Sequence, residues 1–74
     1  MQITIKLFAT LRKGRFDINF REIPPNTTIK EIINDLGIPE DQAAIIFVNS
    51  RHAKLDQKLY EGDIVAFFPP VGGG

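Results

Sequence analysis

The chain has 74 residues, of which 43% are hydrophobic and 24% charged, a composition that fits one small globular domain with a thin core. Nine Lys and Arg balance nine Asp and Glu, so net charge gives no reason to expect nucleic acid or an anionic membrane as a partner. The absence of cysteine excludes disulfides, thiolate metal sites and a cysteine nucleophile.

The start of the chain lacks the basic residues and the long apolar run of a signal peptide. No stretch reaches the ~18 apolar residues of a membrane span. We therefore expect a cytoplasmic protein that is a monomer when free. A domain of this size has no room for a substrate cavity lined by its own catalytic groups, so we do not expect an enzyme.

Two strands are predicted near the N-terminus, because hydrophobic and polar residues alternate there with a period of two. The hydrophobic residues of the first strand are Ile3, Ile5 and Leu7, and those of the second are Phe16, Ile18 and Phe20. Between them, residues 9–15 include Gly14 and are interpreted as a turn. The two strands would then form a hairpin.

A helix is predicted after Pro24 and Pro25. Thr28 and Glu31 have the spacing of a capping box, in which each side chain accepts a hydrogen bond from the other residue's backbone. Gly37 is placed for a left-handed C-terminal cap, and Pro39 prevents the helix from continuing. The apolar stripe of this helix consists of Ile29, Ile32, Ile33 and Leu36.

Three further strands are predicted at residues 44–48, 52–55 and 64–68, the second of them short and at an edge. One helix has to bury its stripe against one face of one sheet, and its crossover connects parallel strands. The order of elements therefore predicts an α+β ubiquitin-like β-grasp fold. Its mixed sheet would have four to five strands, with the first and last strands central and parallel. One sheet face would remain uncovered.

The sharpest feature of the sequence is its end, where Pro69 and Pro70 are followed by Val71 and three glycines. We interpret residues 1–74 as a single domain in which residues 69–74 form a flexible functional tail. Without a Cβ, Gly72 and Gly73 can enter a channel too narrow for a side chain. The carboxylate of Gly74 would be the reacting group, after activation by another protein. The alternative is an unselected, frayed terminus.

A docking surface is predicted beside this tail. If the alternating apolar residues of the central strands face the helix, then Phe8, Ala66 and Phe68 face away from it. Parallel neighbours would bring Phe8 and Phe68 together where the tail begins, next to Pro69 and Pro70. The alternative is that one ring turns inward or is covered by a loop.

Other polar residues have ordinary interpretations. His52 has no cysteine or second histidine to complete a ligand set, so we expect no metal site. Asp56, Glu61 and Asp63 suit turns and caps better than acid–base catalysis. A basic loop, which we interpret as a solvated hairpin end, contains Arg12, Lys13 and Arg15.

The chain resembles the MoaD/ThiS family of ubiquitin-like sulfur-carrier proteins over nearly its whole length. Residues 6–12 (KLFATLR) are similar to the opening of the small subunit of molybdopterin synthase. Val48 and Asn49 resemble a V-N-G turn in which Ser50 replaces the glycine. Residues 59–71 (LYEGDIVAFFPPV), followed by the terminal glycines, resemble the most specific family motif. The loop after the first strand is shorter than in molybdopterin synthase subunits, which usually carry a helix there.

The resemblance implies a mechanism. An E1-like adenylating enzyme, supplied with ATP and magnesium, would activate Gly74, and a sulfur donor would convert the adenylate to a thiocarboxylate. Gly73 would give access to the channel, and Phe68 would pack on partner proteins. The chain itself would bind no cofactor.

The sulfur would pass to a synthase, either the large subunit of molybdopterin synthase or thiazole synthase. The Phe-Phe-Pro-Pro run favours the molybdopterin branch, whereas the Val-Gly-Gly-Gly end resembles thiamine-pathway carriers. Two alternatives remain: a protein modifier conjugated to lysines, and a pure binding module with an idle tail.

Overall fold

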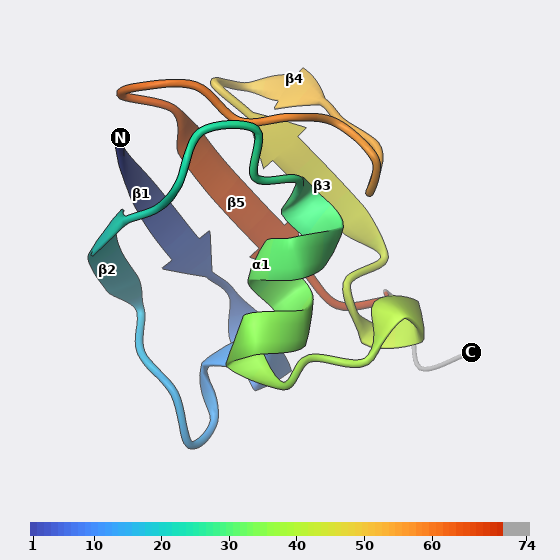
Figure 1. Cartoon of the computed structure of the whole chain (residues 1–74). Helices are drawn as coiled ribbons and strands as arrows, with labels where there is room; N and C mark the ends of the chain where they lie inside the picture. The colour runs from blue at the N-terminus through green and yellow to red at the C-terminus, as the bar shows by residue number, and fades with distance from the viewer. Residues whose placement is uncertain (71–74) are drawn as a thin grey trace.

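The computed structural model describes residues 1–70, in which one α-helix lies across one face of a five-stranded mixed sheet (Figure 1). The spatial order of the strands is β2-β1-β5-β3-β4. Strands β1 and β5 are parallel, and the other neighbouring pairs are antiparallel. The elements are β1 (Gln2–Leu7), η1 (Ala9–Arg12), β2 (Ile18–Glu22), α1 (Ile29–Leu36), η2 (Glu40–Gln42), β3 (Ile45–Val48), β4 (Arg51–His52) and β5 (Ile64–Phe68), where η denotes a 3₁₀-helix. The predicted β-grasp fold, with its first and last strands central, is confirmed.

Helix α1 begins and ends as its sequence predicts. The backbone N–H of Glu31 donates to Thr28 Oγ1 at 3.4 Å, and the N–H of Thr28 donates to Glu31 Oε1 at 3.3 Å, so the capping box is complete. Gly37 ends the helix in the left-handed conformation, with φ of 73°. These two ends set the length of the helix, and its buried residues Ile29, Ile32 and Ile33 define the face that meets the sheet.

The core lies between α1 and the two central strands. It consists of side chains that alternate along β1 and β5 and of the apolar stripe of the helix. Its most deeply buried members there are Ile3, Ile5, Leu7, Ile29, Ile33, Val65 and Phe67. Because each of these side chains has left water, their burial is the main favourable term for folding.

Strand β2 differs from the prediction in two ways. It begins at Ile18, two residues later than the alternation suggested, and Phe16 instead packs against the core from the preceding loop. Phe20 lies opposite Thr4, and Ile18 lies opposite Lys6. Residues directly opposite one another share a sheet face, so Ile18 and Phe20 point away from α1. Both are exposed, at 53% and 68% of their surface.

The link between β1 and β2 is more than a solvated hairpin end, and this corrects the interpretation of Arg15. Its guanidinium donates to the carbonyl oxygens of Leu36 at 3.2 Å and Gly37 at 3.1 Å, and also to that of Leu11. Carbonyl groups at a helix C-terminus carry partial negative charge, so a cation there is favourable. The loop also contains the 3₁₀-helix η1, in place of a simple turn.

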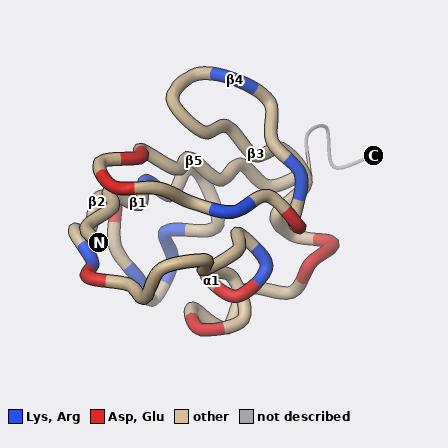
Figure 2. The backbone as a smooth tube through the Cα atoms, turned by 45° about the horizontal axis from the view of Figure 1, so that its top comes forward, with Lys and Arg blue, Asp and Glu red and all other residues tan. Residues whose placement is uncertain are grey.

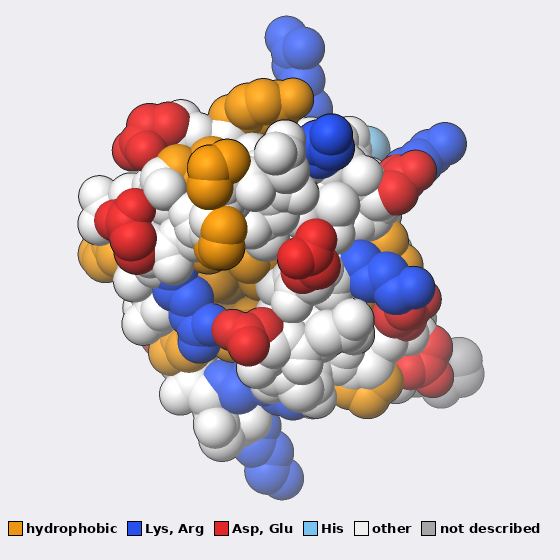
Figure 3. Space-filling model, viewed as in Figure 1, with side chains coloured by type: hydrophobic (Ala, Val, Ile, Leu, Met, Phe, Trp, Pro, Cys, Tyr) orange, Lys and Arg blue, Asp and Glu red, His pale blue; other side chains and the backbone are white. Residues whose placement is uncertain are grey.

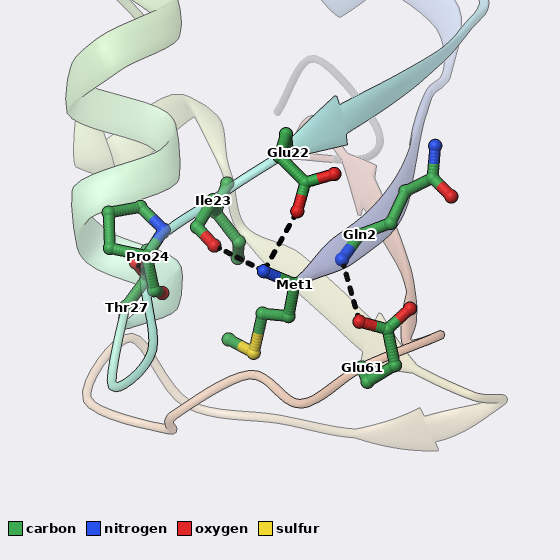
Figure 4. Close-up of polar contacts among 7 residues, drawn as sticks. All are labelled: Met1, Gln2, Glu22, Ile23, Pro24, Thr27 and Glu61. Atoms are coloured by element: carbon green, nitrogen blue, oxygen red, sulfur yellow. Dashed lines mark hydrogen bonds and ion pairs between the residues drawn. The ribbon is translucent and has the colours of Figure 1, made fainter.

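The start of β1 is held from both sides (Figure 4). The α-amino group of Met1 donates to the carbonyl of Ile23 at 2.8 Å and forms an ion pair with Glu22 at 3.0 Å. On the other side, the N–H of Gln2 donates to Glu61 Oε1 at 3.0 Å. Asp63 accepts a hydrogen bond from the N–H of Tyr60 at 2.8 Å, so the turn roles of Glu61 and Asp63 are confirmed.

Charged residues of both signs are distributed around the backbone (Figure 2). The face that carries α1 shows them interspersed with small hydrophobic areas (Figure 3). Within residues 1–70, no helix combines the length and hydrophobicity needed to cross a membrane.

Strands β3 and β4 are joined by the two residues Asn49 and Ser50, whose φ angles are 52° and 71°. Two consecutive positive φ angles are typical of a type I′ turn, which favours Asn followed by Gly. Ser50 therefore holds a left-handed conformation that a glycine would adopt without strain.

Thr28→Ala removes the hydroxyl that accepts the N–H of Glu31, and we expect it to lower the free energy of unfolding by about 1 kcal/mol. Urea denaturation measures this change. Thr28→Ser keeps a hydroxyl and is the matched control, with an expected loss well below that of alanine. Equal losses for both variants would show that the capping box contributes nothing.

Ser50→Gly should raise the free energy of unfolding by about 0.5–1 kcal/mol. Relief of the left-handed conformation gains ~1–2 kcal/mol, and the greater freedom of glycine in the unfolded chain offsets part of it. Ser50→Ala removes the same hydroxyl without relieving the strain, so it should give no gain. A stabilisation common to both variants, measured by urea denaturation, argues against a strained turn.

Candidate functional site

The central strands divide their side chains between two sheet faces as predicted. Ile5 and Phe67 are fully buried beneath α1, whereas Lys6, Ala66 and Phe68 lie on the other face and are partly exposed. The described part of the chain places no helix over that second face (Figure 1). We refer to this surface, formed by the outward side chains of β2, β1, β5 and β3, as the open face.

A cluster of three rings lies at one end of the open face. Phe8 and Phe68 stack with their ring centroids 4.3 Å apart and their planes 10° from parallel. The ring of Phe47 meets Phe68 edge to face at 5.8 Å and 88°. The N–H of Phe8 donates to the carbonyl of Phe67 at 3.2 Å, which extends the β1–β5 ladder to this point. The predicted meeting of Phe8 and Phe68 is therefore confirmed.

Pro69 and Pro70 follow directly after this cluster. Pro69 is partly exposed and Pro70 is exposed. Each proline ring fixes its own φ near −65°, so the direction in which the chain leaves β5 is restricted. The predicted tail residues Gly72, Gly73 and Gly74 lie outside the described residues.

The open face is hollowed beside the rings, with a volume of about 400 Å³. The hollow is lined by the three phenylalanines of the cluster, by Ile64 and Ala66, and by the polar residues Lys6, Asn49 and Ser50. Apolar walls with a few polar groups are typical of a surface that receives another molecule's side chains.

The apolar surface also extends to β2, where sequence reasoning missed it. Four large hydrophobic residues are exposed in the described chain, and Ile18, Phe20 and Ile64 all lie on the open face. Thr4 and Lys6 of β1 lie between the β2 residues and β5. Exposed apolar side chains gathered on one sheet face are typical of interaction sites. The sequence shows the alternation along β2. It does not show which β2 residues share a sheet face with Lys6, because that depends on the β1–β2 register, which the connecting loop sets.

The polar residues considered as possible ligands or acid–base groups lie in ordinary structural positions. His52 lies on β4 and packs against Phe47, with ring centroids 4.5 Å apart. Asp56 is exposed on a turn. Within residues 1–70, no three His, Asp or Glu side chains are grouped so as to hold a metal ion.

Known proteins resemble this chain in sequence and in fold. The sequence profile of the ThiS family matches residues 5–74. A putative molybdopterin converting factor, subunit 1, from Pyrococcus furiosus is 28% identical, with 96% of this chain and 99% of that chain covered and a TM-score of 0.76.

Two further solved structures share the fold. SAMP1 from Haloferax volcanii is 23% identical, with full coverage of both chains and a TM-score of 0.75. A chain from the complex of subunits 1 and 2 of molybdopterin-converting factor from Helicobacter pylori is 22% identical, with full coverage of both chains and a TM-score of 0.65. A search of curated proteins found no match.

The stack of Phe8 on Phe68 should appear as an energetic coupling. We expect the double variant Phe8→Ala, Phe68→Ala to lose less unfolding free energy than the sum of the losses in the two single variants. The expected difference is about 0.5–1.5 kcal/mol. Urea denaturation of the single and double variants measures this coupling.

The control cycle pairs Phe8→Ala with Phe20→Ala, because Phe20 lies on the neighbouring strand β2 opposite Thr4, four residues before Phe8 along β1. These two losses should add. Additivity in the Phe8–Phe68 cycle as well would mean that the rings do not interact in solution.

Proposed function

Because this chain belongs to the ThiS family, a family of ubiquitin-like sulfur carriers and modifiers, we propose that it is a sulfur carrier whose Gly74 is adenylated and then converted to a thiocarboxylate. The observation that carries the proposal is the Phe8–Phe68 stack on the open face, immediately before Pro69. The partly exposed ring pair and Pro69, after which the glycine segment follows, lie at the same end of the domain, and this supports a docking role for the rings.

The chemistry follows from the weak electrophilicity of a carboxylate. The Gly74 carboxylate attacks the α-phosphorus of ATP and releases pyrophosphate, which leaves a mixed anhydride with AMP. The outer sulfur of a donor persulfide then attacks the acyl carbon and displaces AMP, which leaves an acyl disulfide. A thiol, supplied by the donor or by a small-molecule reductant, attacks the donor-side sulfur of that bond, so the thiocarboxylate leaves and the thiol is oxidised to a disulfide. We assign ATP, magnesium and the catalytic groups to an E1-like adenylating enzyme, so that this chain acts as a co-substrate.

A sulfur carrier has to bind two proteins in turn, the activating enzyme and the sulfur acceptor, and the open face suits both contacts. Phe8, Ala66 and Phe68 give a docking surface whose apolar burial supplies affinity, and Pro69 and Pro70 restrict the path of the following residues. Gly72 and Gly73, without side chains, would follow that path into a narrow channel. The activating enzyme and the sulfur acceptor would use the same face in turn.

For the acceptor we propose the large subunit of molybdopterin synthase, in the cytoplasm, with thiazole synthase as the alternative. The similarity to a putative molybdopterin converting factor subunit from Pyrococcus furiosus supports this choice. In Helicobacter pylori, subunit 1 of that factor occurs in a complex with subunit 2. SAMP1 from Haloferax volcanii, a small archaeal modifier protein, shares the fold. We keep conjugation to lysines as the second candidate function.

The direct test is the intact mass of the chain after incubation with the E1-like enzyme of the same organism, ATP, magnesium and a sulfur donor. We expect a gain equal to the replacement of one oxygen by sulfur. Deletion of Gly74 should abolish the gain, and Gly73→Ala should slow it because the added Cβ narrows the fit.

Two results would contradict the proposal. Lysine adducts with Gly-Gly remnants, formed in place of the thiocarboxylate, would assign the chain to the modifiers. Full biological activity of a chain without Gly73 and Gly74 would make it a binding module with an idle tail.

A further inference from the structure

Lys6 occupies the middle of the open face. It lies opposite Ile18 on β2 and opposite Ala66 on β5, so its neighbours on both sides are apolar. Phe8 follows two residues later on the same face, and Lys6 lines the hollow beside the ring cluster. The stem of a lysine packs on such surroundings while its ammonium group stays in water.

No carboxylate of the described residues pairs with Lys6. The described ion pairs use Met1, Arg12, Arg21 and Lys30 as cations. On the strands of the open face, the other ionisable side chain is Glu22 at the end of β2, and His52 lies beyond the β3 border on β4. Glu22 already contacts the Met1 amino group at 3.0 Å. The centre of the apolar surface is therefore a single positive charge.

Lys6 lies beside the surface that a protein acting on Gly74 would contact, since it lines the same hollow as Phe8 and Phe68. Ala66, which lies beside Lys6, is only three residues before Pro69, or about 10 Å of extended chain at ~3.3 Å per residue. A partner that contacts Phe8, Phe68 and Pro69 therefore reaches the ammonium group of Lys6 and removes water from it. A buried charge without a partner is strongly unfavourable, so the covering surface has to supply an acceptor.

We propose that the E1-like adenylating enzyme places an Asp or Glu carboxylate against Lys6, within an apolar contact surface that extends from the ring cluster to Ile18 and Phe20. The inference rests on the proposed function, because it takes the activating enzyme as the occupant of the open face. The apolar residues supply most of the contact area, and the central charge pair fixes orientation and selects against surfaces that lack the carboxylate.

The test is the dissociation constant of the full chain and the E1-like enzyme, measured by calorimetry without ATP so that binding is separate from chemistry. Lys6→Met leaves the enzyme's carboxylate buried and unpaired, so we expect binding about 30-fold weaker or more, which corresponds to about 2 kcal/mol at 1.4 kcal/mol per factor of ten. Lys6→Glu should weaken it further, and Lys6→Arg should retain most of the affinity.

The matched control is Lys54→Glu, an equal charge reversal at an exposed residue in the groove that Lys30 and Glu40 also line. It should leave the dissociation constant within about threefold, since exposed charges distant from the contact are screened. Urea denaturation of every variant verifies that the domain is folded.

A charge exchange identifies the partner group. One Asp or Glu to Lys variant of the enzyme should bind Lys6→Glu better than it binds the unchanged chain. Equal affinity of Lys6→Glu and the unchanged chain would overturn the inference, and so would an equal loss in Lys54→Glu. Complex formation without ATP–pyrophosphate exchange would instead contradict the proposed function and leave the Lys6 comparison valid.

Discussion

Strands β1 and β5 come from opposite ends of the chain, yet they lie side by side at the centre of the sheet and run in the same direction. Parallel neighbours cannot be joined by a tight turn, so the chain between them crosses the sheet through α1 and returns along β3. Their pairing buries Ile5 and Phe67 under the helix, and it brings Phe8 beside Phe68 on the opposite face. The core and the candidate site are therefore two consequences of one pairing.

The sequence was sufficient for the features that depend on local patterns. The capping box of Thr28, the left-handed Gly37 and the opposite facings of Phe67 and Phe68 follow from spacing alone. Two features depend on distant contacts and were not predicted. Arg15 binds carbonyl groups of Leu36 and Gly37, more than twenty residues away in the chain, and no local pattern indicates such a contact.

The apolar extension of the open face was the second missed feature, and it changes how the surface is understood. The alternation along β2 gives the spacing of Ile18 and Phe20 but not the face on which they lie. That face is set by the register in which Phe20 pairs with Thr4, and the register depends on the η1 loop. With these residues included, exposed apolar side chains lie on both sides of β1, and Lys6 is placed between Ile18 and Ala66. A helix that buries its apolar stripe on one side of the sheet, and exposed apolar side chains on the other, suit a domain that is stable alone and still binds proteins.

The functional interpretation depends on the claim that the open face is the surface that contacts the activating enzyme. Amide nuclear magnetic resonance of the labelled chain, titrated with that enzyme, tests it most directly. We expect shifts or broadening at Lys6, Phe8, Ala66 and Phe68 and along β2, with α1 unchanged. Changes confined to α1, with the open face unaffected, would contradict the claim.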